Sequence, residues 1–394
     1  MTGTAIARSH RAHLFGALIA CAIPIVIMCG GRVLAIYLEE KTIHTTAPKD
    51  FFIKNQGLAF QRAAARTPDV LLLYGSSELT DPVINRASDF FSTEPSGFQV
   101  CPVGRAGTTS LNVLQKLGAL GADLRGRKVA ISLSPSSFLT PAVNPYFYAG
   151  NFSLPAASGI LFGDALNRRL KAEIANRMLQ FPDTLAKSAL LELAAGCLAS
   201  GRPVDRLVLM AISPLGKLQN MVLDLQDHFE ALVYILSGEN PVTRLGPRQP
   251  RLRKVRSDKH ADTKEWPPAT RAARDAAFRA RIATAGEWTD LELLFRILEE
   301  AGAQPLILSM PIDNTLKDTR GVSRLAYQAY YDKLAGLTQR YHVPLVDFED
   351  HDSDPTFLVA HTEHPSPSGW RYYDQALDDF FHKINNRVES PLRH

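Results

Sequence analysis

Runs of bulky apolar residues without alternation occur at five places in the chain and predict five strands. The first is VLLLY, beginning at residue 70, and the others cover residues 98–103, 128–134, 305–310 and 343–348. Such runs are typical of strands that are buried on both faces, as in a parallel sheet. Patterns of helical period lie between them, for example at residues 108–120 and 322–341. Because strands alternate with helices, the pattern predicts an α/β fold with a doubly wound parallel sheet.

The middle of the chain, from about residue 140 to about residue 300, has helical periodicity but no strand pattern. We interpret this region as a helical insertion that packs over the edge of the sheet. Within it, residues 244–281 contain 12 Lys and Arg residues against four acids, which is about +8 in a chain whose net charge is +4. This basic loop is either a solvated segment or a contact for anionic headgroups or an anionic polymer.

The N-terminal segment determines the predicted compartment. Residues 14–31 carry no charge and are about long enough to cross a bilayer as one helix. Arg8 and Arg11 precede this run, and by the positive-inside rule they place the N-terminus in the cytoplasm. We therefore expect residues 1–40 to form a cytoplasmic tip and a single-pass anchor in the cell membrane, and residues 41–394 to form an extracytoplasmic domain. A cleaved signal peptide and a buried hairpin helix are the alternatives.

The composition is that of an ordinary globular protein, with 45% hydrophobic and 21% charged residues among 394. Four cysteines are too few for a disulfide scaffold, and we interpret Cys101 and Cys197 as small core residues rather than as a pair. Nucleic acid is not an expected partner of a domain outside the cytoplasm.

The turn Gly75-Ser76-Ser77 follows the first predicted strand, at the sheet edge where open α/β sheets bind ligands. The residues after it can open a helix, whose free N–H groups would favour developing negative charge. This position suits Ser77 as a nucleophile. The same residues would also serve as an ordinary strand-to-helix turn with an N-cap.

A candidate base lies near the C-terminus. His364 precedes the last predicted helix, and a histidine in such a loop can reach the carboxyl edge of the first strand. There it would act as general base toward a serine hydroxyl. His361, Glu363 and His364, with His351 nearby, are an alternative set of metal ligands, but no HExxH spacing or cysteine pair supports them. We expect no metal and no cofactor.

Taken in order, these motifs resemble the DltD family, the membrane-anchored D-alanyl transfer proteins of teichoic-acid D-alanylation, within the SGNH (GDSL-like) hydrolase superfamily. The match covers most of the chain. It consists of the N-terminal anchor, GSSEL at residues 75–79, Gly104 and Gly107 before a helix, LSPxxF at 133–138, MPID at 310–313, and His364 followed by Gly369-Trp370. The resemblance implies that Ser77 is the nucleophile, that His364 is the base, and that Gly104 or Gly107 lends a backbone N–H to the oxyanion site. Ser76 and Ser134 are expected to line the same site.

One position departs from the family pattern. Where the family usually carries an aspartate three residues before the histidine, this chain has His361. The carboxylate that should orient the imidazole is therefore missing from its expected place. Glu363, Asp347 and Asp350 are candidates to replace it, and a Ser–His dyad is the alternative. In an active enzyme the Ser77 hydroxyl and the imidazole should lie within about 2.6–3.2 Å of each other.

The sequence therefore predicts an anchored extracytoplasmic serine acyltransferase or esterase. The resemblance implies a D-alanyl group as cargo and a hydroxyl of an anionic envelope polymer or lipid as acceptor. It also implies a membrane-bound O-acyltransferase and an acyl-carrier protein as partners. Two alternatives stay open: a non-catalytic protein that binds carrier or acceptor, and a thioesterase or esterase that removes misplaced acyl groups.

Overall fold

The computed structural model describes residues 20, 26, 28–94, 96–238, 267–312, 321–359 and 362–383. Five parallel strands form one sheet in the order β2-β1-β3-β4-β5. They are β1 (Val70–Gly75), β2 (Gln99–Gly104), β3 (Lys128–Leu133), β4 (Gln304–Ser309) and β5 (Leu345–Asp347). All five predicted strands are present, and the strand order is that of a doubly wound sheet. The predicted α/β fold with a parallel sheet is thus confirmed.

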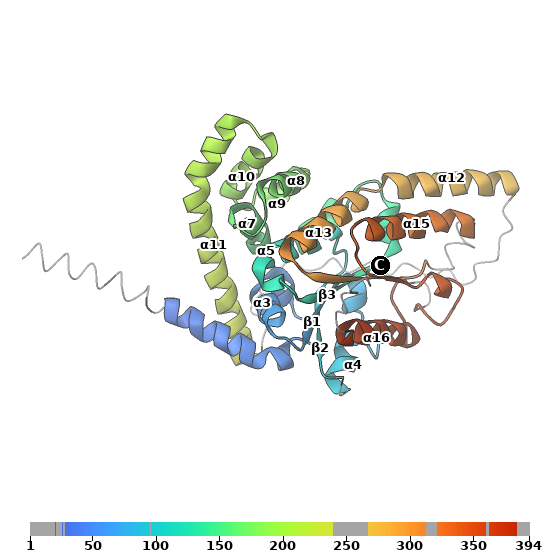
Figure 1. Ribbon diagram of the computed structural model, residues 1–394, viewed down its shortest axis with the longest axis horizontal. Helices are drawn as coiled ribbons and strands as arrows, with labels where there is room; N and C mark the ends of the chain where they lie inside the picture. Colours follow the sequence, from blue (N-terminus) through green and yellow to red (C-terminus); the bar gives the residue numbers. More distant parts are fainter. Residues whose placement is uncertain are drawn as a thin grey trace, which may run out of the picture.

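Both faces of the sheet are covered, because successive side chains of a strand point to opposite sides. From β1, Leu72 and Tyr74 belong to one core, whereas Leu71 and Leu73 belong to another. The first core includes residues of α3 (Ala59–Arg66), α5 (Ser110–Leu120), α13 (Glu287–Ala301) and α15 (Arg324–Arg340). The second includes residues of α4 (Ala87–Thr93) and α16 (Pro367–His382), which lie together on the other side of the sheet (Figure 1). Helices on both faces explain why the strand sequences do not alternate.

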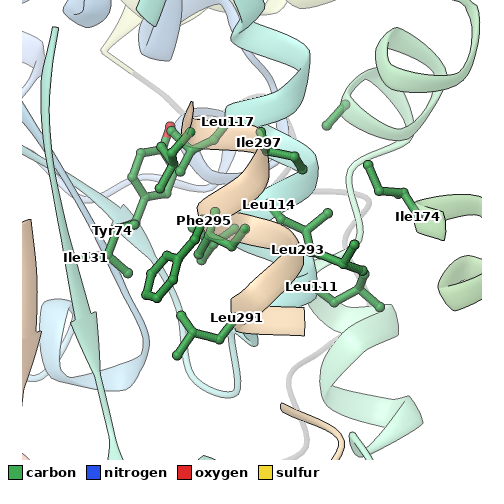
Figure 2. Close-up of a cluster of buried hydrophobic side chains, with 14 of the residues drawn as sticks. Tyr74, Leu111, Leu114, Leu117, Ile131, Ile174, Leu291, Leu293, Phe295 and Ile297 are labelled. Carbon is green, nitrogen blue, oxygen red and sulfur yellow. The ribbon is translucent and has the colours of Figure 1, made fainter. Parts of the chain in front are cut away.

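The predicted buried face of α5 is present. Leu111, Leu114 and Leu117 recur at three-residue intervals and are fully buried against α13 and the sheet (Figure 2). Each buried leucine contributes about 1.5–3 kcal/mol through the area that it removes from water. A capping box formed by Thr109 and Asn112 fixes the start of α5 directly behind the loop that follows β2. The helix therefore holds that loop at the carboxyl edge of the sheet.

Helices fill the described part of the region between β3 and β4. They are α6 (Pro145–Asn151), α7 (Leu154–Phe162), α8 (Arg168–Met178), α9 (Pro182–Leu185), α10 (Ala189–Ser200), α11 (Pro203–Ser237), α12 (Pro268–Thr284) and α13. The 3-10 helix η3 (Pro135–Leu139) also lies in this region, and η1 (Ser77–Leu79), η2 (Gly121–Leu124) and η5 (Glu349–His351) lie elsewhere. We expected the whole region from about residue 140 to about residue 300 to pack over the edge of the sheet. Helix α13 instead packs on a face of the sheet, where its apolar side contacts α5. Within the predicted basic loop, residues 244–266 lie outside the described residues.

Residues 28–46 form an N-terminal helix, which leads into α2 (Phe52–Gln56) and α3. No helix among the described residues combines the length and the hydrophobicity that crossing a membrane requires. The predicted anchor, residues 14–31, lies largely outside the described residues. Cys101 and Cys197 are buried free thiols, as the sequence patterns predict.

Candidate active site

Ser77 lies just beyond the carboxyl end of β1, between the ends of the neighbouring strands β2 and β3. The chain leaves β1 through Ser76 and turns at once into η1. The backbone N–H groups of Thr80 and Asp81 both donate to the Ser77 carbonyl, at 3.0 Å each. This turn is three residues long and is not the longer helix that we expected. The helix-dipole argument for Ser77 therefore does not apply, because the dipole of a single turn is small.

A hydrogen-bonded relay joins three side chains at this edge. The His364 Nε2 lies 2.8 Å from the Ser77 Oγ, within the range that we expected. The His364 Nδ1 lies 2.8 Å from the Asp81 Oδ2. The side chains of His364 and Asp81 are 22% and 30% exposed, so the relay is partly open to solvent. When Nδ1–H donates to the carboxylate, Nε2 carries the lone pair that can accept a hydrogen bond from the Ser77 hydroxyl.

Asp81 is the orienting carboxylate that the sequence analysis missed. It follows Ser77 by four residues across η1, and a helical turn places residues four apart on the same side of the chain. That Ser-x-x-x-Asp spacing was the available signal. Two of the expected carboxylates lie elsewhere: Asp347 ends β5, and Asp350 lies in η5.

Glu363, another of the three expected carboxylates, does not contact the imidazole nitrogen either. Its Oε2 accepts a hydrogen bond from the Ser134 hydroxyl at 2.5 Å, and the Ser134 Oγ also lies 2.9 Å from the Ser136 Oγ. The Glu363 carboxylate thus binds Ser134 after the end of β3, and the carboxylate that binds the His364 Nδ1 is that of Asp81. Among the described residues, no group of three His, Cys, Asp or Glu side chains is placed to hold a metal ion, and His361 lies outside them.

The loop that carries His364 is fixed on both sides. The N–H of Val359 donates to the His364 carbonyl at 2.8 Å, and the N–H of His364 donates to the Thr362 Oγ1 at 3.2 Å. The Ser366 hydroxyl then caps α16 by accepting the N–H of Gly369 at 3.2 Å. These contacts position the imidazole without any contribution from a substrate.

The two predicted oxyanion glycines differ in what they bind. The Gly104 N–H donates to the Asn55 Oδ1 at 2.6 Å in a buried position, so it is not available to an oxyanion. Glycine is required at 104 because a Cβ there would lie 2.0 Å from the Gly75 carbonyl oxygen. The Gly107 N–H donates instead to the Ser76 Oγ at 3.1 Å, from a backbone with φ of +78°. Of the two, Gly107 is the one that directs its N–H toward the serine turn.

Comparison with known proteins shows the family to which the chain belongs. The sequence model of the DltD protein family matches residues 52–280 and 263–382, which is well over half of the chain. The chain belongs to the DltD family. "Protein DltD" of Bacillus subtilis (strain 168) is 25% identical over 341 residues, covering 83% of this chain and 86% of the relative. "Protein DltD" of Staphylococcus aureus (strain NCTC 8325 / PS 47) is 22% identical over 383 residues, covering 89% and 94%.

In this member of the DltD family, a buried carboxylate lies beneath the serine turn. Glu78 accepts the N–H of Ser76 at 2.9 Å. Burial raises the pKa of Glu78, while hydrogen bonds from the backbone and from Ser132 and the charge of His364 act in the opposite direction. The hydrogen bond from the Ser76 N–H to the buried Glu78 carboxylate holds the backbone of the turn in place next to Ser77.

Two pockets in this DltD-family chain are lined by residues that neighbour the relay in sequence, namely Ser76 and Glu363. One is lined by Ser76 and Ser134 together with residues of α5 and by Glu287 of α13. The other is lined by Glu363 with Tyr330 of α15 and apolar residues of η3 and α12. Ser134 of the first pocket donates to Glu363 of the second. Ser76 and Ser134 thus line the same pocket.

Proposed function

We propose that this chain is a serine acyltransferase in which Ser77 carries the acyl group and His364, oriented by Asp81, moves the protons. The single observation that supports this most strongly is the continuous relay, with 2.8 Å between each pair of partners. A serine hydroxyl is a weak nucleophile, and an adjacent base in hydrogen-bond reach activates it. An imidazole that is also bound at its second nitrogen has its orientation and tautomer fixed.

The reaction has two symmetrical halves. The Ser77 Oγ attacks the acyl carbonyl while its proton passes to the His364 Nε2, and the tetrahedral intermediate collapses when that proton is returned to the leaving group. This leaves an ester on Ser77. An acceptor hydroxyl then gives its proton to the same nitrogen and attacks the ester, which transfers the acyl group and regenerates Ser77. Asp81 stabilises the imidazolium in both halves.

Gly107 supplies an N–H for the oxyanion in this proposal. Its present partner, the Ser76 hydroxyl, is a rotating group that can release the N–H when a carbonyl oxygen enters. Preorganised N–H donors of this kind contribute several kcal/mol to such reactions, because they face the charge that develops. Ser134, which lines the pocket shared with Ser76, would contact the bound acyl group.

Family membership supports the choice of cargo. For a member of the DltD family we propose D-alanyl transfer to a hydroxyl of an anionic cell-envelope polymer or lipid. The acyl group would arrive through a membrane-bound O-acyltransferase and an acyl-carrier protein. We also propose that residues 14–31 anchor the chain in the cell membrane, because the run carries no charge and follows Arg8 and Arg11.

An active-site label tests the proposal. The full chain, purified in mild detergent, is incubated with a fluorophosphonate that carries a reporter, and the adduct is located by peptide mass spectrometry. The adduct should map to Ser77 and be absent from Ser77→Ala and His364→Ala. Ser92→Ala, which changes an exposed serine on α4, is the matched control and should label like the native chain. A folded Ser77→Ala variant that still transfers acyl groups would overturn the assignment and leave a binding role.

A further inference from the structure

Helix α11 carries an apolar face that no described residue covers. Its large exposed side chains fall on one side of the helix when they are placed at about 3.6 residues per turn: Val204, Leu207, Met210, Leu215, Leu218, Met221, Val222, Phe229 and Leu236. We call these nine residues the α11 face. The helix has 35 residues, and at about 1.5 Å per residue it is about 52 Å long. Met210 is 71% exposed and Phe229 is 65% exposed. Soluble monomers seldom expose an apolar patch of this length.

The opposite side of α11 is already used by the domain. Gly216 lies so close to Phe162 of α7 that a Cβ there would meet its ring at 2.1 Å. Asp227 is buried and accepts the N–H groups of Leu58 and Ala59 at 2.6 and 2.8 Å, which caps α3. The α11 face therefore points away from the core that the described residues form. Whatever covers it lies outside the described residues.

The N-terminal helix indicates which occupant this is. Residues 28–46 cross the C-terminal part of α11, where Arg32 pairs with Asp224 at 2.7 Å and buried Glu39 bonds to buried His228 at 2.8 Å. The first residues of this helix extend past α11, on the side away from the sheet (Figure 1). Residues 14–31, the proposed anchor, lead directly into it. An anchor that leaves the domain on this side brings the bilayer surface to α11.

We propose that α11 lies in the membrane interface, with the α11 face in contact with the boundary between headgroups and acyl chains. This inference rests on the anchor in the proposed function. The N-terminal helix adds exposed Val33, Leu34 and Tyr37 beside α11, which extends the apolar surface toward the anchor. An interfacial helix binds by burying its apolar side in this boundary. The domain would thus be held at the membrane by two contacts, which restricts how it can turn about the anchor.

The charges of α11 predict which lipids it needs. The helix carries Arg206 and Lys217 against Asp205, Asp224, Asp227 and Glu230, so it has no basic excess to attract anionic headgroups. Insertion should therefore depend on apolar area and not on lipid charge. Zwitterionic vesicles should suffice, and about 1 M salt, where charges are screened beyond about 3 Å, should leave the contact intact.

Single-cysteine labelling of the full chain tests this inference. The four native cysteines are replaced, and an environment-sensitive fluorophore is attached at Leu207→Cys, Leu218→Cys or Phe229→Cys. The protein is reconstituted in phosphatidylcholine vesicles with and without nitroxide-labelled lipid. These labels should shift their emission to the blue and lose most of it to the nitroxide lipid. Arg206→Cys, off the apolar face, and Gln375→Cys, on α16, are controls that should stay in water. Because all five positions are at the surface, folding should be unaffected, and circular dichroism checks it.

A further single-cysteine variant, which keeps only Cys21 within the proposed anchor, separates this inference from the proposed function. If the Cys21 label is quenched while the three labels on the α11 face are not, the interfacial helix is wrong and the anchor stands. If neither is quenched, the anchor and the helix both fail. If the α11 labels change their emission only when a membrane protein partner is reconstituted with the chain, the face docks protein, and the lipid assignment is overturned.

Discussion

The carboxylate of Asp81 lies 2.8 Å from the Nδ1 of His364, although 283 residues separate them in the chain. Each residue is positioned by its own local structure: Asp81 by the η1 turn, and His364 by the loop in front of α16. The acid of this relay therefore moves with the nucleophile and not with the base. A displacement of the C-terminal loop would break both of its hydrogen bonds at once.

Asp81→Asn should lower the kcat of acyl transfer by about 10²–10⁴-fold, because an amide at this position no longer fixes the tautomer or stabilises the imidazolium. The KM should change little, since the side chain does not contact the substrate in the proposed mechanism. Steady-state rates with a small acyl ester measure both parameters. Glu363→Gln is the comparison: it changes the other nearby carboxylate, which binds Ser134, and its loss in kcat should be far smaller. The reverse ranking of the two variants would return the orienting role to Glu363.

The sheet could be predicted because each strand carries its own signal. A run such as VLLLY is apolar at every position since both of its faces are buried, and no distant contact is needed to recognise it. Ser77 and His364 could be predicted for a different reason, namely the motifs around them. Their distance of 2.8 Å then followed from the topology, which brings the end of β1 and the loop before α16 to one edge.

The remaining features depended on information that is not local. Asp81 was missed because its partner, the Nδ1 of His364, lies 283 residues further along the chain, and the four-residue spacing from Ser77 does not by itself indicate that pairing. Gly104 was misassigned because its N–H binds Asn55, a residue 49 positions earlier, and no pattern in the sequence signals that bond. For α11, helical periodicity predicted an apolar side, but periodicity alone does not tell whether that side faces the core or the exterior.

The bond between Asn55 and Gly104 should be structural. Asn55→Ala would leave the buried Gly104 N–H without a partner, which costs about 1–3 kcal/mol in the free energy of unfolding, and it also removes the bonds from Asn55 to Asp50 and to the Phe51 carbonyl. Gln56→Ala, at the next position, removes only an exposed bond to the Gly150 carbonyl and should stay within about 0.5 kcal/mol of the native chain. Thermal or urea unfolding of the two variants measures the difference. Equal stabilities would mean that the Gly104 N–H does not depend on Asn55 as its acceptor. The argument that this N–H is unavailable to an oxyanion would then be wrong.

The compartment follows from the proposed anchor. A reporter enzyme that is active only outside the cytoplasm, fused after His394, should give signal in cells. The same fusion with residues 14–31 deleted should lose the signal, because the domain would no longer leave the cytoplasm. A fusion to a cytoplasm-specific reporter is the matched control and should be silent. Signal from that control instead would place the domain in the cytoplasm, which contradicts the anchor, the acceptor and the partners together.

Burial should make the stability of this protein depend on pH through Glu287. This side chain lies at the end of the pocket beside Ser76, where it accepts the Ser110 N–H at 2.6 Å. Burial and the nearby Asp290 raise the pKa of Glu287 from an ordinary value of 4.5 to about 7, while its bonds to Ser110 and the charge of Arg177 act against the shift. Between pH 4.5 and 7 the unfolded chain therefore releases a proton that the folded chain retains. The stabilisation is complete below pH 4.5, is lost as the pH rises through 7, and stays lost above it.

Glu287→Gln should remove this pH dependence, because glutamine cannot titrate and still offers an oxygen to the Ser110 N–H. The difference in unfolding free energy between pH 5 and pH 8 should be smaller in the variant, by up to about 3 kcal/mol at 1.36 kcal/mol per unit of pKa shift. Urea titrations at the two pH values measure it. Glu299→Gln changes an exposed glutamate on the same helix and should keep the dependence of the native chain. If Glu287→Gln kept it as well, Glu287 would be ionised in the folded protein at neutral pH, and the pocket would have to supply enough polar contacts to hold that charge.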